Sequence, residues 1–185
     1  MTTRKTDWVD WIKTLLIAIL MFILIRMFIA IPIIVEGPSM LPTLENGERL
    51  IVDKLTLTFE KPERFDIVVF HATSNKDYIK RVIGLPGEAI EYRDDILYVD
   101  GKPIEESFLD EVKSGLSPDD KYTTDFSLVE IPNGQLTVPE DHLFVLGDNR
   151  NNSTDSRHLG FIPLDEVTGI ARLTYWPVND IEIYY

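Results

Sequence analysis

The sequence predicts a mostly β domain preceded by one membrane-spanning helix. A long apolar stretch lies near the N-terminus, and after it the chain consists of short apolar runs separated by turn residues, without an extended 3.6-residue periodicity. With 185 residues, 44% of them hydrophobic, the chain suits one domain of ordinary size plus a short appendage.

The apolar stretch, residues 11–31, reads WIKTLLIAILMFILIRMFIAI and contains only two charged residues, Lys13 and Arg26. About 20 such residues are needed to cross a bilayer as a helix. Arg26 lies close enough to the end of the stretch for its side chain to reach outward to the interface. Pro32 is expected to mark the far end of the helix.

The orientation follows from the charges around this stretch. Three basic residues (Arg4, Lys5 and Lys13) lie at its start, which favours a cytoplasmic N-terminus. A cleaved signal peptide is the alternative, but no small-residue cleavage site follows, so an uncleaved anchor is favoured. The expected organisation is a cytoplasmic segment (1–10), a transmembrane helix (11–31) and an extracytoplasmic β domain (32–185).

The β domain is predicted from seven candidate strands separated by turns. The strands are expected at residues 49–52, 67–71, 78–83, 89–93, 96–99, 143–146 and 169–175. The turn signals are Asn46-Gly47, Pro86-Gly87, Asp100-Gly101 and Asn133-Gly134. Asp100-Gly101 predicts the clearest hairpin. Residues 105–128 are polar and acidic, and we expect them to form a surface insertion.

Composition excludes several classes of function. The formal net charge is −13, and because residues 1–35 carry +2, the rest of the chain carries −15. This charge disfavours nucleic acid as a partner. The chain has no cysteine, which excludes disulfides and thiol nucleophiles. Three histidines without an HExxH pair give little support to a zinc site, so we expect no metal and no cofactor.

A serine between two prolines is the first candidate for chemistry. In EGPSMLPTL, residues 36–44, Pro38 and Pro42 restrict the backbone on either side of Ser39. Ser39 is eight residues past Ile31. At ~3.5 Å per extended residue it lies within about 28 Å of the predicted helix end, so a reaction there would occur near the membrane surface. A simple turn-forming serine is the alternative.

A nucleophilic serine needs a base, and Lys80 in DYIKRVIGLPGE, residues 77–88, is a candidate. Strand alternation places Lys80 on one face with the apolar neighbours Tyr78 and Val82. Such surroundings disfavour the ammonium form and lower the lysine pKa toward neutrality. Arg81 cannot be the base because a guanidinium does not lose its proton in proteins. The alternative is a lysine that extends from a sheet face into solvent.

A third stretch, FVLGDNRNNSTDSRHLGFIP at residues 144–163, is a hydrophobic strand that ends in a dense polar loop. Its polar side chains can form a hydrogen-bonded, charge-paired network: Asp148, Asn149, Arg150, Ser153, Asp155 and Arg157. The loop fails the EF-hand pattern, since Arg150 and Ser153 occupy positions that calcium loops reserve for a ligand and for glycine. A surface turn rich in Asn and Asp remains an alternative.

In this order after an N-terminal anchor, GPSMLPTL, DYIKRVIGLPGE and GDNRNNSTDSRHLGF resemble the motifs of the bacterial type I signal peptidases. The resemblance covers the anchor and most of residues 33–176. It implies a β fold of antiparallel sheets and a membrane-anchored endopeptidase that removes signal peptides from exported preproteins with a serine and lysine dyad.

The resemblance assigns roles residue by residue. It makes Ser39 the nucleophile, Lys80 the general base and Ser153 the residue that orients the lysine. It places four charged residues in a supporting network: Arg81, Asp148, Asp155 and Arg157. It places four residues in the shallow substrate pockets: Met40, Leu44, Tyr78 and Ile79. Many relatives have an oxyanion-hole serine where this chain has Gly37, so the backbone N–H of Ser39 becomes the main expected donor.

The resemblance also implies partners and a location. The expected partners are membrane-bound preproteins and the lipid bilayer, with no nucleic acid, and a monomer is expected. The expected location is the bacterial cell membrane, with a single pass. Two alternatives stay open. One is a Ser-His-Asp hydrolase that uses His71, His142 or His158 with Asp148 or Asp155. The other is a non-catalytic anchored β domain that binds a cell-envelope partner.

Overall fold

The computed structural model describes residues 7–73, 76–117 and 120–184. Its α-helices are α1 (Asp7–Phe28), α2 (Thr56–Phe59), α3 (Asp110–Ser114) and α4 (Ser156–Leu159). Its strands are β1 (Ala30–Ile34), β2 (Arg49–Asp53), β3 (Ile67–Thr73), β4 (Lys76–Gly84), β5 (Ile90–Arg93), β6 (Ile96–Val99), β7 (Lys102–Ile104), β8 (Phe126–Ser127), β9 (His142–Leu146), β10 (Ile162–Pro163), β11 (Val167–Trp176) and β12 (Glu182–Ile183). Short 3₁₀ helices are η1 (Ser107–Leu109), η2 (Leu128–Glu130), η3 (Leu164–Glu166) and η4 (Val178–Asp180).

The strands form two antiparallel sheets, which confirms the predicted fold class. The larger sheet has the order β1-β2-β11-β3-β4-β9-β10, with β12 also paired to β11, and the smaller has the order β7-β6-β5-β8. Every predicted strand is present, with ends moved by no more than a few residues. Asp100 and Gly101 both have positive φ and join β6 to β7, as the hairpin signal predicts.

The N-terminal region differs from the prediction at its end. Helix α1 ends at Phe28, and the chain then enters strand β1, which pairs with β2 in full. Pro32 lies within this strand and not beyond a helix. A proline is tolerated there because β1 is an edge strand, whose outer side makes no ladder hydrogen bonds.

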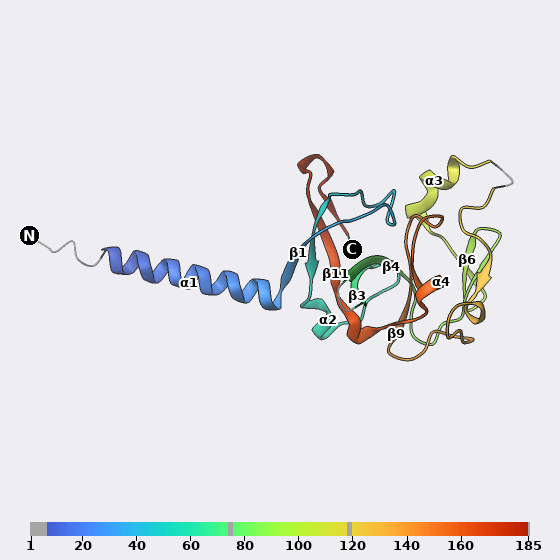
Figure 1. The fold of residues 1–185 in the computed structure, drawn as a ribbon, viewed down its shortest axis with the longest axis horizontal. Helices are drawn as coiled ribbons and strands as arrows, with labels where there is room; N and C mark the ends of the chain where they lie inside the picture. Colours follow the sequence, from blue (N-terminus) through green and yellow to red (C-terminus); the bar gives the residue numbers. More distant parts are fainter. Residues whose placement is uncertain (1–6, 74–75, 118–119, 185) are drawn as a thin grey trace, which may run out of the picture.

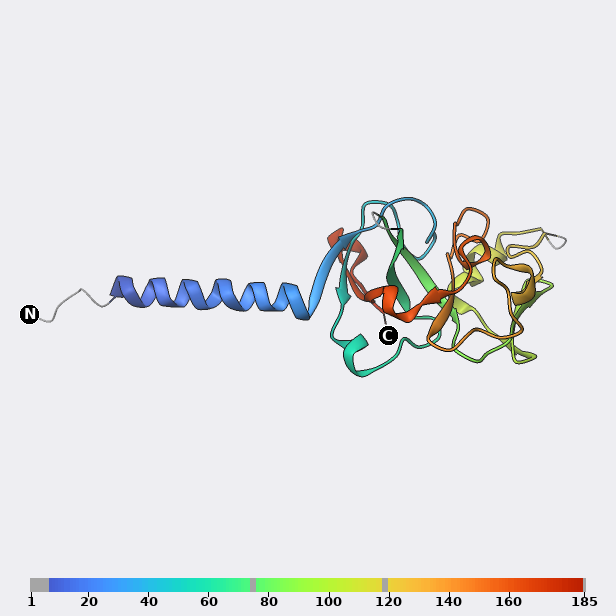
Figure 2. The same cartoon turned by 60° about the horizontal axis from the view of Figure 1, so that its bottom comes forward.

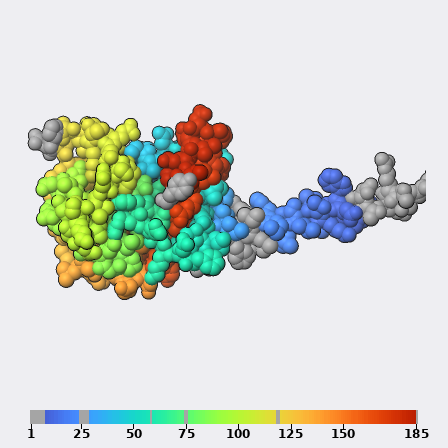
Figure 3. Space-filling view, turned by 180° about the vertical axis from the view of Figure 1, so that it is seen from behind, coloured from blue at the N-terminus to red at the C-terminus, as the bar shows by residue number. Residues whose placement is uncertain are grey.

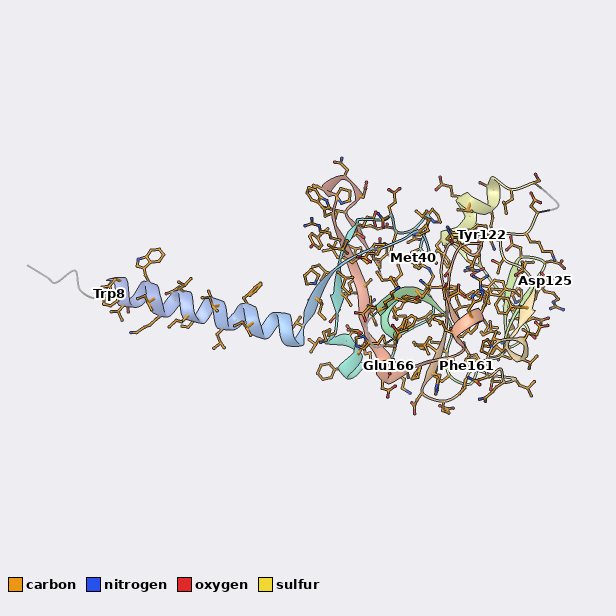
Figure 4. The ribbon with its side chains drawn as sticks, viewed as in Figure 1. Trp8, Met40, Tyr122, Asp125, Phe161 and Glu166 are labelled. Carbon is orange, nitrogen blue, oxygen red and sulfur yellow. The ribbon has the colours of Figure 1, made fainter. Side chains whose placement is uncertain are left out.

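Helix α1 projects away from the β domain, as Figures 1 and 2 show from two directions. Trp8 lies near its start, at the end remote from the domain (Figure 4). Within the described part of the chain, no helix combines the length and the apolar character needed to cross a bilayer. Arg4 and Lys5 lie outside the described residues, as does the side chain of Arg26.

Residues 105–128 are not simply a surface insertion. Leu109 and Thr123 are completely buried, and Glu106 and Tyr122 are nearly so. The segment carries α3 and lies at the end of the domain opposite α1 (Figures 1 and 3). It packs against the loop that follows β9, because Tyr122 donates a hydrogen bond to the carbonyl of Asp148. Composition indicated an exposed segment, but the buried side chains of this segment include apolar and hydroxyl groups and the carboxylate of Glu106.

The hydrophobic core supports the turn that contains Ser39. One cluster of buried side chains unites Met40 and Leu44 of this turn with Leu50 of β2 and Val69 of β3. Met40 accordingly lies inside the domain (Figure 4). Since buried side chains occupy defined positions in a close-packed core, this turn is held on a rigid base.

Candidate active site

The nucleophile candidate lies in a tight turn between β1 and β2. The N–H of Leu41 donates to the carbonyl of Pro38 at 3.2 Å, and the N–H of Leu44 donates to the carbonyl of Met40 at 2.9 Å. The side chain of Asn46 accepts a hydrogen bond from the N–H of Gly37 at 2.9 Å. With Met40 and Leu44 buried beneath it, the turn fixes the direction of the Ser39 side chain.

Lys80 of β4 reaches Ser39 directly. Its Nζ lies 2.8 Å from Ser39 Oγ and 2.7 Å from the carbonyl oxygen of Ile79. Lys80 is 3% exposed. Burial lowers the pKa of Lys80 from 10.5 to about 8, against the opposing charges of Asp155 and Asp148. A large fraction of Lys80 is therefore neutral in mildly alkaline solution, where it can accept a proton from Ser39.

Asp155 organises the loop after β9. It caps α4 by accepting from the N–H of Arg157, and its Oδ2 accepts from the N–H of Gly147 at 3.1 Å. The Arg157 guanidinium donates to both of its carboxylate oxygens, at 2.9 and 2.8 Å. Burial would raise the pKa of Asp155, but the hydrogen bonds and charge of Arg157 outweigh burial and hold that pKa below its usual range.

A second ion pair joins this loop to the strand of the candidate base. Arg81 of β4 donates to both oxygens of Asp148, at 2.8 and 2.6 Å. The same guanidinium donates to the carbonyl of Phe65 and to the hydroxyl of Thr43 in the Ser39 turn. Bidentate pairs of this kind fix geometry as well as charge. The loop, β4 and the Ser39 turn are therefore held together by one arginine.

Ser153 lies in the same cleft as Ser39 and Lys80. Its Oγ is buried and makes no hydrogen bond of good geometry within the described residues, although the side chain contributes to lowering the pKa of Asp155. The predicted contact of Ser153 with Lys80 stays a prediction.

Ser39 and Lys80 line a cleft of about 750 Å³. It is lined by residues 33–40, 76–80, 151–154 and 158. Strand β9 pairs with β4 only at Arg81, Val82 and Gly84. The first half of β4, residues 76–80, therefore keeps one edge without a strand partner in the described part of the chain.

Three of the four predicted pocket residues line this cleft: Met40, Tyr78 and Ile79. Leu44 does not. It is fully buried in the core beneath the Ser39 turn. The pocket roles themselves stay predictions.

The backbone N–H of Ser39 donates to no acceptor among the described residues. It is thus free to donate to a substrate oxygen. Gly37 has φ of +87°, a conformation that L-residues with side chains rarely adopt. The backbone at this position therefore suits a glycine.

The sequence model of the family described as "Signal peptidase, peptidase S26" matches residues 8–176, which include the whole of this site. The chain belongs to this family. It is 47% identical over 169 residues to signal peptidase I of Bacillus caldolyticus, covering 91% of this chain and 92% of that protein. It is 36% identical over 184 residues to signal peptidase IB of Staphylococcus aureus strain Mu50, covering 96% of this chain and 94% of that protein.

A solved structure is also similar. The crystal structure of a signal peptidase I from Enterococcus faecalis V583 is 47% identical, with a TM-score of 0.57, and covers 60% of this chain and 97% of that chain. The resemblance noted in the sequence is thereby confirmed at the level of family and fold. The identity of the relatives also makes the chain a serine endopeptidase of the type I signal peptidase class.

Two residues have contacts at the site that the sequence did not predict: Asn149 was expected only as part of a polar network, and Gly147 was given no role. Asn149 donates from its backbone N–H to the Ser39 carbonyl at 3.0 Å and from its side chain to the Pro38 carbonyl at 3.1 Å. Gly147 lies against Ser39 and Ser153 so closely that a Cβ there would be 2.5 Å from the Ser39 carbonyl oxygen. The available signal was a glycine directly after a hydrophobic strand, which often marks a close backbone approach.

The histidines lie in other arrangements. His71 pairs with Asp77 at 2.5 Å, and His142 contacts the carbonyl of Glu140. His158 lines the cleft, but none of the three bonds to Ser39 within the described residues. Asp148 and Asp155 are both bound to arginines. These contacts give the Ser-His-Asp alternative no support.

Proposed function

We propose that the chain is a membrane-anchored signal peptidase in which Ser39 is the nucleophile and Lys80 the general base. The observation that carries this proposal is the 2.8 Å contact between Lys80 Nζ and Ser39 Oγ at the base of an open cleft. Burial lowers the pKa of Lys80 to about 8, so part of its amine is neutral near neutral pH and can accept a proton.

The reaction begins when the neutral Lys80 amine takes the hydroxyl proton of Ser39 while Oγ attacks the carbonyl carbon of the scissile bond. The resulting oxyanion accepts a hydrogen bond from the Ser39 N–H. Lys80 then donates its proton to the departing amine, and the carbon–nitrogen bond breaks to leave an acyl-enzyme. Lys80 next activates a water molecule, which attacks the ester, releases the signal peptide and restores Ser39.

The substrate binds as an extended strand along the free edge of β4 at residues 76–80. Main-chain hydrogen bonds on a sheet edge give affinity, and pockets for alternate side chains give specificity. The edge ends at Arg81, where β9 takes over the pairing, so the substrate strand pairs only with residues 76–80. Tyr78, Ile79 and Met40 restrict the side chains that fit near the scissile bond.

The anchor is the N-terminal segment, with its N-terminus in the bacterial cytoplasm and the β domain on the other side of the cell membrane. Strand β1 follows α1 almost directly, and Ser39 follows Phe28 by eleven residues. This short connection supports a substrate that is itself held at the membrane, namely a preprotein with its apolar signal segment in the bilayer. The proposed enzyme is a monomer and uses no cofactor.

Cleavage of a model preprotein by the purified protein tests the dyad. Ser39→Ala and Lys80→Ala are each expected to reduce kcat by at least about a thousandfold, because members of a catalytic unit fail together. His71→Ala, His142→Ala and His158→Ala are expected to retain activity. Normal cleavage by Lys80→Ala would refute the dyad, and normal cleavage by Ser39→Ala would refute Ser39 as the nucleophile.

A further inference from the structure

The peptide unit of Gly147 is held from both sides. Its N–H donates to Asp155 at 3.1 Å, and its carbonyl accepts from Arg150 Nε at 3.0 Å. A Cβ on this residue would lie 2.2 Å from Ser153 Oγ and 2.5 Å from the Ser39 carbonyl oxygen. Gly147 therefore acts as a spacer between the nucleophile turn and Ser153, and any movement of Gly147 displaces both.

Arg150, which holds the carbonyl side, is itself fixed by a different segment of the chain. Its NH2 donates to Glu106 Oε1 at 2.6 Å, and its NH1 donates to Tyr92 Oη at 2.9 Å and to Thr123 Oγ1 at 3.1 Å. Tyr92 Oη donates to the same Glu106 oxygen at 2.6 Å. The side chains of Arg150 and Glu106 are 0% and 1% exposed. Glu106 and Thr123 both belong to the segment first expected to be a surface insertion.

A buried ion pair of this kind is weak evidence for stability, because desolvation of the two charges offsets their attraction. Charge-assisted hydrogen bonds do, however, fix geometry. The contacts form a continuous series from Glu106 to Arg150, from Arg150 to the Gly147 carbonyl, and from Gly147 to Ser39 and Ser153. Lys113 lies 3.6 Å from the other Glu106 oxygen and carries the network outward to α3.

We infer that Glu106 is a positioning residue, which through Arg150 and Gly147 sets the placement of Ser39 and Ser153 for catalysis. Through their contacts with Arg150, Glu106 and Thr123 thereby support the loop that follows β9, so their segment is not a passive insertion. This inference rests on the proposed function, since it concerns the geometry of the same dyad.

The test compares variants of the full chain in cleavage of a model preprotein. Glu106→Ala is expected to lower kcat roughly 10- to 100-fold with KM changed less than about twofold, because a displacement on the order of 1 Å in a reacting group has this effect. Glu106→Gln keeps the acceptor oxygen and is expected to recover most of kcat. Lys121→Ala is the matched control in the same segment, since the Lys121 ammonium pairs with the exposed Asp94 and Asp125.

Tyr92→Phe keeps the ring and removes only the hydroxyl, which bonds to both Glu106 and Arg150. This variant therefore tests the inference even if Glu106→Ala does not fold. Its expected effect is a several-fold fall in kcat at unchanged KM, measured where circular dichroism shows full folding.

The same variants should shift the pH midpoint of kcat, which a purely structural role would leave in place. A lowered melting temperature with wild-type kcat and pH midpoint would overturn the inference. If the Glu106 and Tyr92 variants give that result while Ser39→Ala and Lys80→Ala lose activity, the positioning role of Glu106 is wrong and the Ser39–Lys80 dyad is retained.

Discussion

Lys80 combines two opposing influences at one atom. Burial withdraws its ammonium from water and lowers the pKa, while the carboxylates of Asp155 and Asp148 favour the charged form and oppose the change. Each carboxylate is bound to an arginine, which reduces its effect on the lysine. Burial is the larger influence, and the resulting pKa of about 8 is compatible with a base that works near neutrality.

This pKa predicts the pH dependence of cleavage. The active form is the neutral amine, so kcat/KM should rise about tenfold per pH unit below the pKa and level off above about 8. The measurement is peptide cleavage between about pH 6 and pH 10. His158→Gln is the control, since His158 lines the cleft. A midpoint near 6.5 that disappears in this control would contradict the assignment of Lys80.

Gly147→Ala is predicted to disable the enzyme without large unfolding. The added Cβ would lie 2.2 Å from Ser153 Oγ and 2.5 Å from the Ser39 carbonyl, so the nucleophile turn and Ser153 must move apart. We expect kcat to fall by roughly a hundredfold, as for other displacements of reacting groups. Gly115→Ala is the matched control, because its Cβ would meet only Val112 O at an ordinary 3.6 Å. Equal activities of the two variants would contradict this role of Gly147.

At the scale of elements, the longer strands were predictable and the short ones were not. Runs such as residues 67–70 and 143–146 are apolar throughout and become parts of β3 and β9, two interior strands of the larger sheet. The strands β8, β10 and β12 have two residues each, which is too few to produce a pattern. Strand β1 was hidden because its residues Ala30–Ile34 continue the apolar composition of α1.

The candidate site was predictable to a similar extent. Ser39 and Lys80 stand out because flanking prolines and apolar strand neighbours are local features of the sequence. Contacts between residues far apart in the sequence have no local sequence pattern from which they could be predicted. Glu106 lies 44 residues from Arg150, and only tertiary packing reveals that they share a hydrogen bond. The acidic composition of residues 105–128 indicated solvent exposure. In the structure, however, the carboxylate of Glu106 is buried.

The ion pair that joins β4 to the catalytic loop should be important for stability. Arg81 and Asp148 have side chains that are 8% and 0% exposed. Asp148→Ala leaves the guanidinium buried and uncompensated, so we expect the free energy of unfolding to fall by about 3–5 kcal/mol. Chemical denaturation measures this change. Asp141→Asn removes the charge from an exposed pair with Lys61, keeps a residue type that tolerates the positive φ of this position, and should lower the same quantity by less than about 1 kcal/mol. Similar losses in both variants would show that burial does not decide the effect.

At the scale of the whole molecule, helix α1 and the β domain meet at β1. Helix α1 projects from the domain, whereas β1 is part of the larger sheet and leads directly into the Ser39 turn (Figure 1). The sharp boundary between Phe28 and Ala30 therefore separates the projecting helix from the strand that leads into the site.

Two truncations should reveal this boundary. Removal of residues 1–28 is expected to leave the melting temperature and the cleavage of a soluble peptide nearly unchanged, because the sheets remain intact. Removal of residues 1–34 also deletes β1, which pairs with β2 at five positions and contributes Ile33 to the core. Full burial of an isoleucine is worth roughly 1.5–3 kcal/mol, and although Ile33 is only partly buried, the ladder with β2 is lost as well. The second truncation should therefore lower the free energy of unfolding by an amount on the order of 2 kcal/mol and reduce cleavage sharply. Thermal melts and peptide assays of the two proteins in parallel provide the comparison. Equal stability and activity would mean that β1 is dispensable, and that the Ser39 turn is positioned by the core beneath Met40 and Leu44 alone.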